Sequence, residues 1–546
     1  MEEREQRFTG DRYSLNLAAE SISTVLSFLG GIVSTAILWR AIAWGSWTTQ
    51  DYGVVKVLTN AGLLLFPFII LGINSSVVRV VAEYACDRSK LAQAITGSLV
   101  IVLASSLTVI VCALLFRIDL FLLEQKTVGV LSPTQLFLFW VITLVTLLPS
   151  ALLRLIQGAF QGLQIIKRTV IVDIVYNTVR ILALIFLALT LQVTIANILV
   201  LNLGLGLIAA GSAIGLLLRE TKRNSVLLYR RPGREVTGKL LKLASVFFVA
   251  SIAGSGLTNL TVLWVNTYGS LVDVGHYTIA QGIVVTATAV LHSPLIAMTP
   301  NLTVEYTKGQ RDVLVRKFRE GYRMLVPTLG FSFAMLFAFA HQILRIVFNE
   351  TGVQTTTFLQ LLSFSIFLIV TAVYSYLYVA LNDTRGLLYA SLQQIAVQVI
   401  WVVTMAPLIG VNAVAMIWLS YLPYFFIQHR YSKRKHAISM DLHIVGKDIV
   451  VALFFAALMW VTVSIAQQLV SILPVFPVLQ AALVGLLAIP FWYLFILVTV
   501  HLRLIDSTDM GNMERVLRIV PPVWWVSRPM VRHIRLLSER QQEGSV

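Results

Sequence analysis

The sequence is dominated by apolar segments that are too long to be helices of a soluble core. A helix needs about 20 mostly apolar residues to cross a bilayer, and the chain contains fourteen segments of this kind. Backbone groups in lipid must pair within their own segment, which favours helices over open strands. The sequence therefore predicts an all-α polytopic membrane protein with about 14 transmembrane helices. The predicted spans are 15–43, 54–78, 91–116, 136–163, 169–191, 193–218, 241–267, 277–301, 322–348, 356–381, 386–408, 411–429, 448–471 and 476–502.

The composition excludes several classes of protein. Hydrophobic residues make up 57% of the 546 residues and charged residues only 12%, about half of the roughly 25% found in soluble domains. A soluble enzyme or a disordered chain does not have these values. The two cysteines, Cys86 and Cys112, are too few for a disulfide framework or a cysteine metal site.

The distribution of lysine and arginine predicts the orientation of the chain in the membrane. If the N-terminus is cytoplasmic, the segments and helix ends on the cytoplasmic side hold 35 of the 42 basic residues, and the outer loops hold only Arg117 and Lys126. This asymmetry follows the positive-inside rule and predicts that both termini are cytoplasmic. It also accounts for the net charge of +16, so anionic membrane lipid, and not nucleic acid, is the expected neighbour of the basic loops.

A faint internal repeat predicts the domain organisation. Leu38-Trp39 and Tyr52 recur as Leu263-Trp264 and Tyr277, with a constant offset of 225 residues. The repeat predicts two related six-helix bundles that run in the same direction through the membrane, an arrangement typical of transporters. The predicted segments are the N-terminal cytoplasmic segment 1–14, the bundles 15–218 and 241–429, the basic linker 219–240, the cytoplasmic loop 430–447, helices thirteen and fourteen in 448–502 and the basic cytoplasmic tail 503–546.

The sequence lacks the common motifs of energy conversion and metal catalysis. It contains no Gly-x-x-x-x-Gly-Lys-Ser/Thr, no His-Glu-x-x-His and no Cys-x-x-Cys. The predicted loops are short, and the outer loops carry few acids. We therefore expect a protein without cofactor or resident metal that is not an enzyme. A membrane glycosyltransferase or glycan polymerase is an alternative that needs an outer loop bearing acids.

Polar residues within the predicted spans are the candidates for function, because charge in the bilayer core is costly and normally faces a cavity or a partner. In 169–191, four polar residues recur at i, i+3, i+4 and i+7 and so share one helix face. The spans 136–163 and 15–43 carry similar stripes, and Arg40 and Lys56 lie near the outer ends of the first two spans. The stripe candidates are Asp173, Tyr176, Asn177 and Arg180, then Arg154, Gln157 and Gln161, and then Glu20.

Simpler interpretations stay open for these residues. Serine, asparagine and glutamine commonly join membrane helices by hydrogen bonds. Asp173 and Arg180 are candidates for an internal ion pair, and Arg40 and Lys56 have the alternative of reaching the lipid headgroups. Three charged stripes in one half of the chain nevertheless favour a water-filled cavity. The excess of arginine over acid in these stripes favours an anionic substrate.

Several short motifs at helix ends carry a resemblance to a known family. They are Asp51-Tyr52-Gly53, Leu71-Gly72, Gln161-Gly162 and Val274-Gly275 with Tyr277 and Ala280. On these motifs and the predicted topology, the chain resembles the polysaccharide-type (lipid-linked oligosaccharide) flippase family of the multidrug/oligosaccharidyl-lipid/polysaccharide exporter superfamily. Two features depart from the family pattern. Trp44-Gly45-Ser46-Trp47 occupies the region of its usual Gly-Pro, and the seventh span carries Thr258, Asn259 and Thr261 where members often carry an acid.

The resemblance implies a flippase that moves a polyprenyl-diphosphate-linked oligosaccharide to the outer leaflet of a prokaryotic cell membrane by alternating access. The expected partners are this substrate, anionic lipid and glycan-assembly enzymes. From the residues we expect Arg154 and Arg180 to bind the diphosphate, with Arg40 and Lys56 as outer candidates. Gln157, Gln161, Asn177 and Tyr176 are further cavity candidates, and Glu20 and Asp173 are candidates for ion coupling. A cation-coupled multidrug exporter of the same superfamily is the main alternative.

Overall fold

The computed structural model describes residues 29–42, 44–45, 47–84, 87–118, 130–163, 165–223, 233–471 and 477–502, together with residues 528, 531, 533 and 534. Throughout these ranges the regular structure is helical and contains no strand. Eleven helices of the described chain are long and apolar enough to cross a membrane. The prediction of an all-α, multi-pass membrane protein is therefore confirmed.

The eleven helices coincide with predicted spans two to seven, nine to eleven, thirteen and fourteen. Predicted span one lies partly outside the described residues, and its described part is the apolar helix Leu29–Ile42. Span eight falls within one helix of 37 residues, Leu271–Thr307. Span twelve is divided into shorter helical pieces, Val411–Ala415, Ile417–Ser420 and Tyr421–His436. The total of fourteen spans and the cytoplasmic position of the termini stay predictions.

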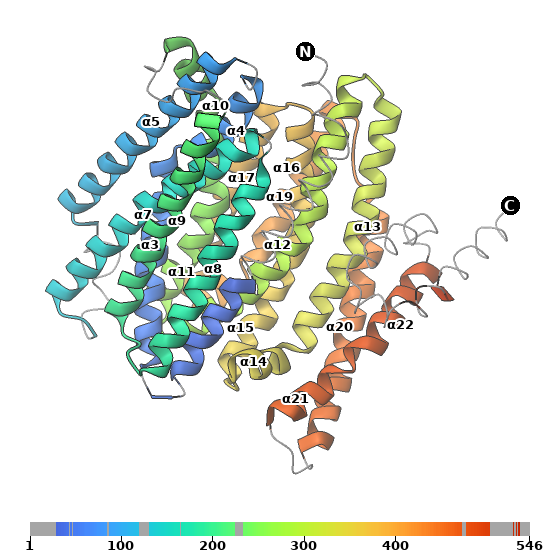
Figure 1. The fold of residues 1–546 in the computed structure, drawn as a ribbon. Coiled ribbons are helices and arrows are strands. Elements are labelled where there is room, and N and C mark those ends of the chain that lie inside the picture. Colours follow the sequence, from blue (N-terminus) through green and yellow to red (C-terminus); the bar gives the residue numbers. More distant parts are fainter. Residues whose placement is uncertain are drawn as a thin grey trace. The chain divides into compact units, whose positions relative to one another are not determined.

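The helices form two compact units, one from residues 1–282 and 387–417 and the other from residues 283–386 and 418–546. Figure 1 gives their labels. The first unit contains the helix Leu29–Ile42, α3 (Thr49–Ile70), α4 (Ile73–Glu83), α5 (Arg88–Leu115), α7 (Pro133–Gly162), α8 (Ile166–Leu189), α9 (Ile195–Arg223), α10 (Arg234–Ser251), the π-helical turn η2 (Ile252–Gly256), α11 (Leu257–Tyr268) and α18 (Val411–Ala415). The bundle boundaries expected from the repeat divide the chain differently and stay a prediction.

The second unit contains α13 (Arg311–Ala338), α14 (Ala340–Phe348), α15 (Val353–Ser363), η3 (Phe364–Leu368), α16 (Ile369–Ala380), α19 (Tyr421–His436), α20 (Leu442–Ser471), α21 (Pro477–Gly485) and α22 (Ala488–His501). Three elements belong partly to each unit, namely α12 (Leu271–Thr307), α17 (Thr384–Ile409) and η4 (Ile417–Ser420). Within the second unit, α13 packs along α20 and α14 packs against α21 (Figure 1).

Local sequence signals explain where several helices begin. Thr48 and Asp51 form a capping box at the start of α3, in which each side chain accepts from the other residue's backbone amide. Ser132 and Gln135 form the same motif at the start of α7. These caps satisfy amide groups that a helix N-terminus leaves without partners. In the predicted topology both caps lie on the outer side, where the chain re-enters the membrane.

The second predicted span is interrupted at Leu71 and Gly72, whose φ angles are 49° and 71°. Gly72 also lies against α10, where a Cβ atom would be 2.5 Å from the Phe248 amide nitrogen. Glycine is thus required twice at this position, for its positive φ and for the close approach of α10. The Leu71-Gly72 motif therefore has a structural role, which is the junction between α3 and α4.

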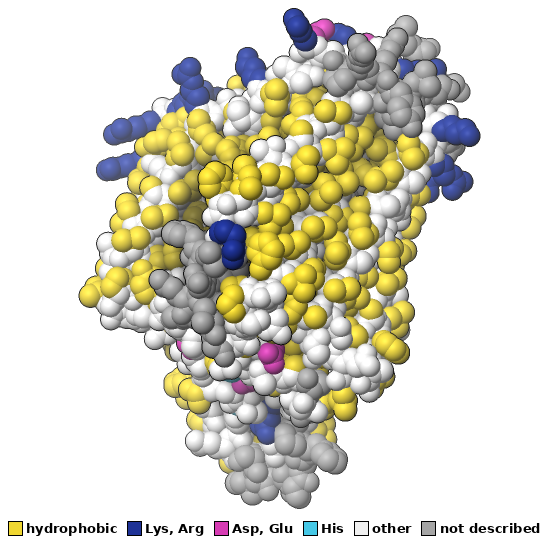
Figure 2. Space-filling view, turned by 90° about the vertical axis from the view of Figure 1, so that its left-hand side faces the viewer, with side chains coloured by type: hydrophobic (Ala, Val, Ile, Leu, Met, Phe, Trp, Pro, Cys, Tyr) yellow, Lys and Arg dark blue, Asp and Glu magenta, His cyan; other side chains and the backbone are white. Residues whose placement is uncertain are grey.

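The lipid-facing surface is visible on α5. Large apolar side chains recur along one stripe of this helix and are exposed, namely Val100, Leu103, Leu107, Val111 and Leu115. On the side of the molecule shown in Figure 2, hydrophobic side chains cover a broad middle zone, and most of the lysine and arginine side chains in view lie near one end. This pattern fits a surface that faces acyl chains in the middle and a charged leaflet at one end.

A buried aspartate joins two segments at the predicted cytoplasmic end of the second unit. Asp383, in the turn between α16 and α17, is 8% exposed. Its carboxylate accepts hydrogen bonds from Lys435 Nζ at 2.8 Å, from the Gly386 amide at 3.0 Å and from Tyr431 Oη at 3.2 Å, and it contacts His436 Nε2 at 2.9 Å. Burial opposes the charged form, but these hydrogen bonds outweigh it and hold the pKa of Asp383 at about 2.

This arrangement predicts a loss of stability in acid. A carboxyl whose pKa is lowered on folding stabilises the protein above its ordinary pKa of 3.8, and the stabilisation disappears as the pH falls towards about 2. The shift corresponds to about 2 kcal/mol. We expect the thermal midpoint of the detergent-solubilised protein to fall more steeply between pH 4 and pH 2.5 than that of Asp383→Asn. Equal slopes for the two proteins would contradict the assignment.

Candidate functional site

The polar stripes of α7 and α8 meet in the first unit. Gln157 Nε2 on α7 donates to Asp173 Oδ1 on α8 at 2.9 Å, and Asn177 Nδ2 donates to the Asp173 carbonyl oxygen at 2.8 Å. Gln157 and Asn177 are both 8% exposed. The carboxylate of Asp173 is therefore held by an amide between the helices. This contact agrees with the simpler interpretation of hydrogen bonding between helices, at least for these residues.

The helix Leu29–Ile42 lies against the same stripe. A Cβ atom on Gly30 would be 2.6 Å from Asn177 Oδ1, so the backbone of this helix approaches the asparagine directly. Ser34 is fully buried and donates back to the Gly30 carbonyl oxygen at 2.7 Å. Three helices thus bring polar groups together. Glu20, the coupling candidate on the first predicted span, lies outside the described residues.

Arg154 and Arg180 differ from the other polar residues of α7 and α8 because neither is engaged by an acid of the described chain. Arg154 is exposed on α7, and Arg180 is half-buried on α8. The Nε of Arg180 is buried without a hydrogen-bond partner. The ion pair between Asp173 and Arg180 that the spacing allowed is not formed. Tyr176 and Gln161 are both half-buried.

Arg168, also on α8, differs from Arg180 because it forms an ion pair with an acid of this unit. Its Nη2 lies 2.7 Å from Glu220 Oε1 on α9, and the glutamate is 6% exposed. This ion pair joins α8 to α9 and has a structural role. A guanidinium group without such a partner, as in Arg180, retains its donors for a ligand.

The cationic candidates lie at different depths. Arg154 is eight residues from the end of α7 and Arg180 is fourteen residues from the start of α8, which places them about 12 Å and about 21 Å from the connection between these helices. In the predicted topology this connection is cytoplasmic. Arg40 lies near the end of the helix Leu29–Ile42, and Lys56 lies near the start of α3. In the predicted topology these two helix ends are on the outer side of the membrane. The four cations therefore span much of the membrane thickness within this unit.

Aromatic rings surround the outer candidates. The Lys56 ammonium group lies over the Tyr52 ring, 5.1 Å from its centroid. The same ring contacts Trp39 and Trp47 edge-on at centroid distances of 5.5 Å and 5.9 Å, and Trp39 contacts His276 at 5.5 Å. Lys56 is thus held by a cation–π contact inside the unit. His276 packs against an aromatic ring, as a lone histidine on a helix commonly does.

The repeated hairpin motifs pack against each other at this end of the unit. Gly53 lies against the backbone of α12, where a Cβ atom would be 2.1 Å from the Leu271 carbonyl oxygen. Gly275 lies against Thr49 in the same way, at 3.0 Å from its Cγ2. Tyr52 and Tyr277 are both buried, with 0% and 1% exposure. The Tyr-Gly motif therefore provides close packing between helices.

The helix of the seventh predicted span, which comprises α10, η2 and α11, departs from regular α geometry beside its polar residues. The π-helical turn η2 separates α10 from α11, and such turns are frequent at functional sites. Gln281 Nε2 donates to Thr261 Oγ1 at 3.1 Å, and Gln394 Nε2 donates to the Ala253 carbonyl oxygen at 3.2 Å. The region where family members often carry an acid is therefore polar but uncharged in this chain.

A buried acid that the sequence did not single out lies in the second unit. Asp448 on α20 is 1% exposed, and both of its carboxylate oxygens lack a hydrogen-bond partner. Its electrostatic neighbour is Arg323 on α13. Asp448 follows Lys447 at the edge of a predicted span, where charge is ordinary, so no local pattern indicates that its carboxylate is buried.

Comparison with known proteins places the chain in a family. Residues 16–303, more than half of the sequence, match the family described as polysaccharide biosynthesis protein. The chain belongs to this family. A search of curated proteins finds no match.

The fold is similar to those of several solved transporters, two of which are described as members of the MOP (multidrug/oligosaccharidyl-lipid/polysaccharide) superfamily. The structure is similar to the lipid II flippase MurJ in an inward closed conformation, with a TM-score of 0.65 and 12% identity over 90% of this chain and 99% of that one. It is also similar to an inward-facing multidrug resistance MATE family transporter, with a TM-score of 0.55 and 14% identity over 76% and 93%. A MOP transporter from Pyrococcus furiosus gives a TM-score of 0.56 and 12% identity over 81% and 96%. At these identities the likeness concerns the fold alone.

Proposed function

We propose that this member of the polysaccharide biosynthesis family is a flippase for polyprenyl-diphosphate-linked oligosaccharide, which it moves from the cytoplasmic to the outer leaflet of a prokaryotic cell membrane. The observation that carries the proposal is the pair Arg154 and Arg180, which lie in membrane-spanning helices without an acidic partner in the described chain. Charge in such helices is costly unless a ligand or cavity faces it. A phosphorylated glycan carrier as ligand agrees with the description of the family as polysaccharide biosynthesis protein.

The chemistry of the site fits each part of this substrate. Guanidinium groups bind phosphate oxygens through two parallel hydrogen bonds, so Arg154 and Arg180 would hold the diphosphate. The amides of Gln157, Gln161 and Asn177 and the hydroxyl of Tyr176 suit glycan hydroxyls. The prenyl chain would stay in lipid while the two lobes alternate access to the site. Arg40 and Lys56 would receive the diphosphate towards the outer side, from which glycan-assembly enzymes would take the product.

The membrane potential is a sufficient energy source for this movement. Each elementary charge that crosses 100 mV gains about 2.3 kcal/mol, so a diphosphate with two negative charges gains about 4.6 kcal/mol on moving outward. This value holds provided that the arginines stay in place. This energy would suffice without ATP, and Asp173 and Glu20 stay candidates for ion coupling.

The second candidate is a cation-coupled multidrug exporter, since the fold is shared with MATE transporters. Such a protein needs an acidic site for cations. Asp173, the acid of the described part of the candidate site, already accepts a hydrogen bond from Gln157. The surplus of arginine at this site favours the flippase.

Native mass spectrometry of the gently purified protein tests the choice between these functions. We expect a co-purifying lipid whose fragmentation gives a polyprenyl diphosphate and a glycan. Added polyprenyl-diphosphate glycan should bind more tightly than the monophosphate form. Binding of an added organic cation, with only bulk phospholipid retained, would instead support the drug exporter and overturn the flippase proposal.

A further inference from the structure

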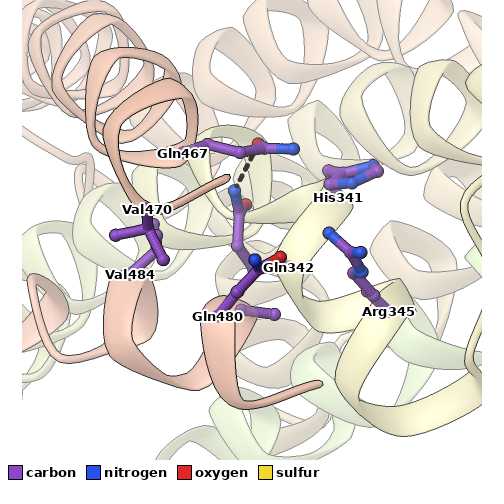
Figure 3. A pocket seen from close by; sticks show the side chains of 8 residues that line it. His341, Gln342, Arg345, Gln467, Val470, Gln480 and Val484 are labelled. Atoms are coloured by element: carbon purple, nitrogen blue, oxygen red, sulfur yellow. Dashed lines mark hydrogen bonds between the residues drawn. The ribbon is translucent and has the colours of Figure 1, made fainter. Parts of the chain in front are cut away.

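A second cationic site lies in the other unit, and none of its residues is assigned to the transport site above. His341 and Arg345 on α14, Gln342 between them, Gln467 on α20 and Gln480 on α21 line a pocket of about 50 Å³ (Figure 3). This volume, which is the space open to the centres of water molecules, holds a few waters or one small ionic group, since one water needs about 10–15 Å³ of it. The pocket is therefore too small for a glycan.

The polar groups of this pocket are ordered by the fold. Gln342 is 3% exposed, and its Nε2 donates to Gln467 Oε1 at 2.9 Å. The remaining oxygen, Gln342 Oε1, is buried without a hydrogen-bond partner. A buried acceptor left in this state destabilises the folded protein. A ligand that donates a hydrogen bond to this oxygen would remove that destabilisation.

The positive charge of the pocket is that of Arg345, and His341 adds a ring N–H donor. His341 and Arg345 are four residues apart, so their side chains share one face of α14, and Figure 3 shows both directed towards the glutamines. No acid of the described chain forms an ion pair with either residue. The connection between α20 and α21, residues 472–476, contains no charged residue in the sequence. The ligand that complements these groups is an anion that also carries a hydroxyl group.

The surroundings of the pocket indicate where this anion comes from. Exposed apolar side chains lie on α20 and α21 close to the pocket residues, namely Ile465, Leu469, Leu479 and Leu483. Helices α13 and α20 begin at basic segments that are predicted to be cytoplasmic, so α14 and α21 lie at the predicted outer end of this unit. A cationic pocket beside a lipid-facing surface suits an amphiphile whose headgroup lies at the membrane surface.

We propose that this pocket binds the phosphate headgroup of a phospholipid of the outer leaflet, with a headgroup hydroxyl donating to Gln342 Oε1. Arg345 and His341 hold the phosphate oxygens. Phosphatidylglycerol has this chemistry, with one phosphate charge and free hydroxyls on its headgroup. The site does not depend on the transported substrate, so it stands or falls separately from the flippase proposal.

Lipid binding to the full-length protein tests the site directly. We expect native mass spectrometry in mixed micelles to show a retained phosphatidylglycerol that is lost at least about tenfold more readily from the variant His341→Gln/Arg345→Gln, since each charge-assisted hydrogen bond contributes about 1.5–3 kcal/mol. Arg385→Gln, an exposed arginine at the other end of the unit, is the matched control and should bind as the wild type does. Equal retention by the double variant and the control would overturn the proposal.

Two further experiments distinguish a phospholipid from a soluble phosphate compound as the ligand and test the role of Gln342. Gln342→Leu should lower the retention of phosphatidylglycerol relative to phosphatidic acid, which lacks the glycerol hydroxyls, by about threefold or more at a pH at which the phosphate of phosphatidic acid is fully ionised. An unchanged ratio would overturn the role of Gln342. Inorganic phosphate and glycerol phosphate serve as soluble competitors. If either displaces the lipid at micromolar concentration, the pocket serves a soluble phosphate compound and the lipid assignment is wrong.

Discussion

Replacing Arg180 by alanine is expected to lower the rate of glycolipid translocation in proteoliposomes by about 10- to 100-fold, because hydrogen bonds to a charged group contribute about 1.5–3 kcal/mol. The amount of folded protein should not fall. Arg180 Nε is buried without a partner, and no acid of the described chain pairs with this arginine, so the substitution breaks no ion pair in this part of the protein. The assay measures labelled polyprenyl-diphosphate glycan that becomes accessible to a lectin on the opposite leaflet.

Two other variants of the same helix separate a loss of substrate binding from a loss of stability. Arg180→Lys keeps the charge but loses the planar fork, so translocation should recover only in part. Arg168→Ala breaks the ion pair with Glu220 and leaves a buried carboxylate, so it should lower the thermal midpoint. The translocation rate per folded molecule should be largely retained. A fully active Arg180→Ala would remove this residue from the binding site.

The second large effect is expected at Gly53. In the variant Gly53→Ala, the added Cβ would be 2.1 Å from the Leu271 carbonyl oxygen, a distance that only a backbone movement of α3 or α12 can relieve. Overpacking of this kind costs about 1–3 kcal/mol or more. We expect a clear fall in the thermal midpoint and in the yield of monodisperse protein on fluorescence-detected size-exclusion chromatography.

Gly204→Ala on α9 is the matched control, because a Cβ at this position meets nothing within 4 Å. Alanine is the better helix former by about 1 kcal/mol, so this variant should be as stable as the wild type or more stable. If the two alanine variants unfolded at the same temperature, the close approach between α3 and α12 would not be important for stability.

Much of the fold follows from the sequence because lipid imposes a strict rule. Each helix that crosses a membrane must contain its own hydrogen bonds and enough apolar length, so eleven of the predicted spans match spanning helices within a few residues at most ends. The rule says less where a helix is irregular. The break at Leu71 and Gly72 lies within one apolar stretch, and its position depends on the close approach of α10. The division of predicted span twelve into short pieces was likewise not predicted.

The candidate site was predicted unevenly. Helical periodicity placed Asp173 and Asn177 on one face correctly, since residues four apart are neighbours on any α-helix. Periodicity did not identify the partner of Asp173, which comes from another helix in the form of Gln157. It also did not distinguish Arg168 from Arg180. Both are arginines of α8, and only the packing of α9 decides which of them meets an acid.

The sequence by itself determined that the protein lies in a membrane, that it is helical and to which family it belongs. These properties depend on composition, segment length and short motifs that are local in the chain. Tertiary structure decided which polar groups are satisfied. The pocket at His341 and Arg345 shows this, since its glutamines come from three helices that are up to 138 residues apart in sequence. The burial of Asp448 was not predicted for the same reason, because it depends on how α13 packs along α20. Burial and pairing depend on long-range contacts that no local pattern encodes.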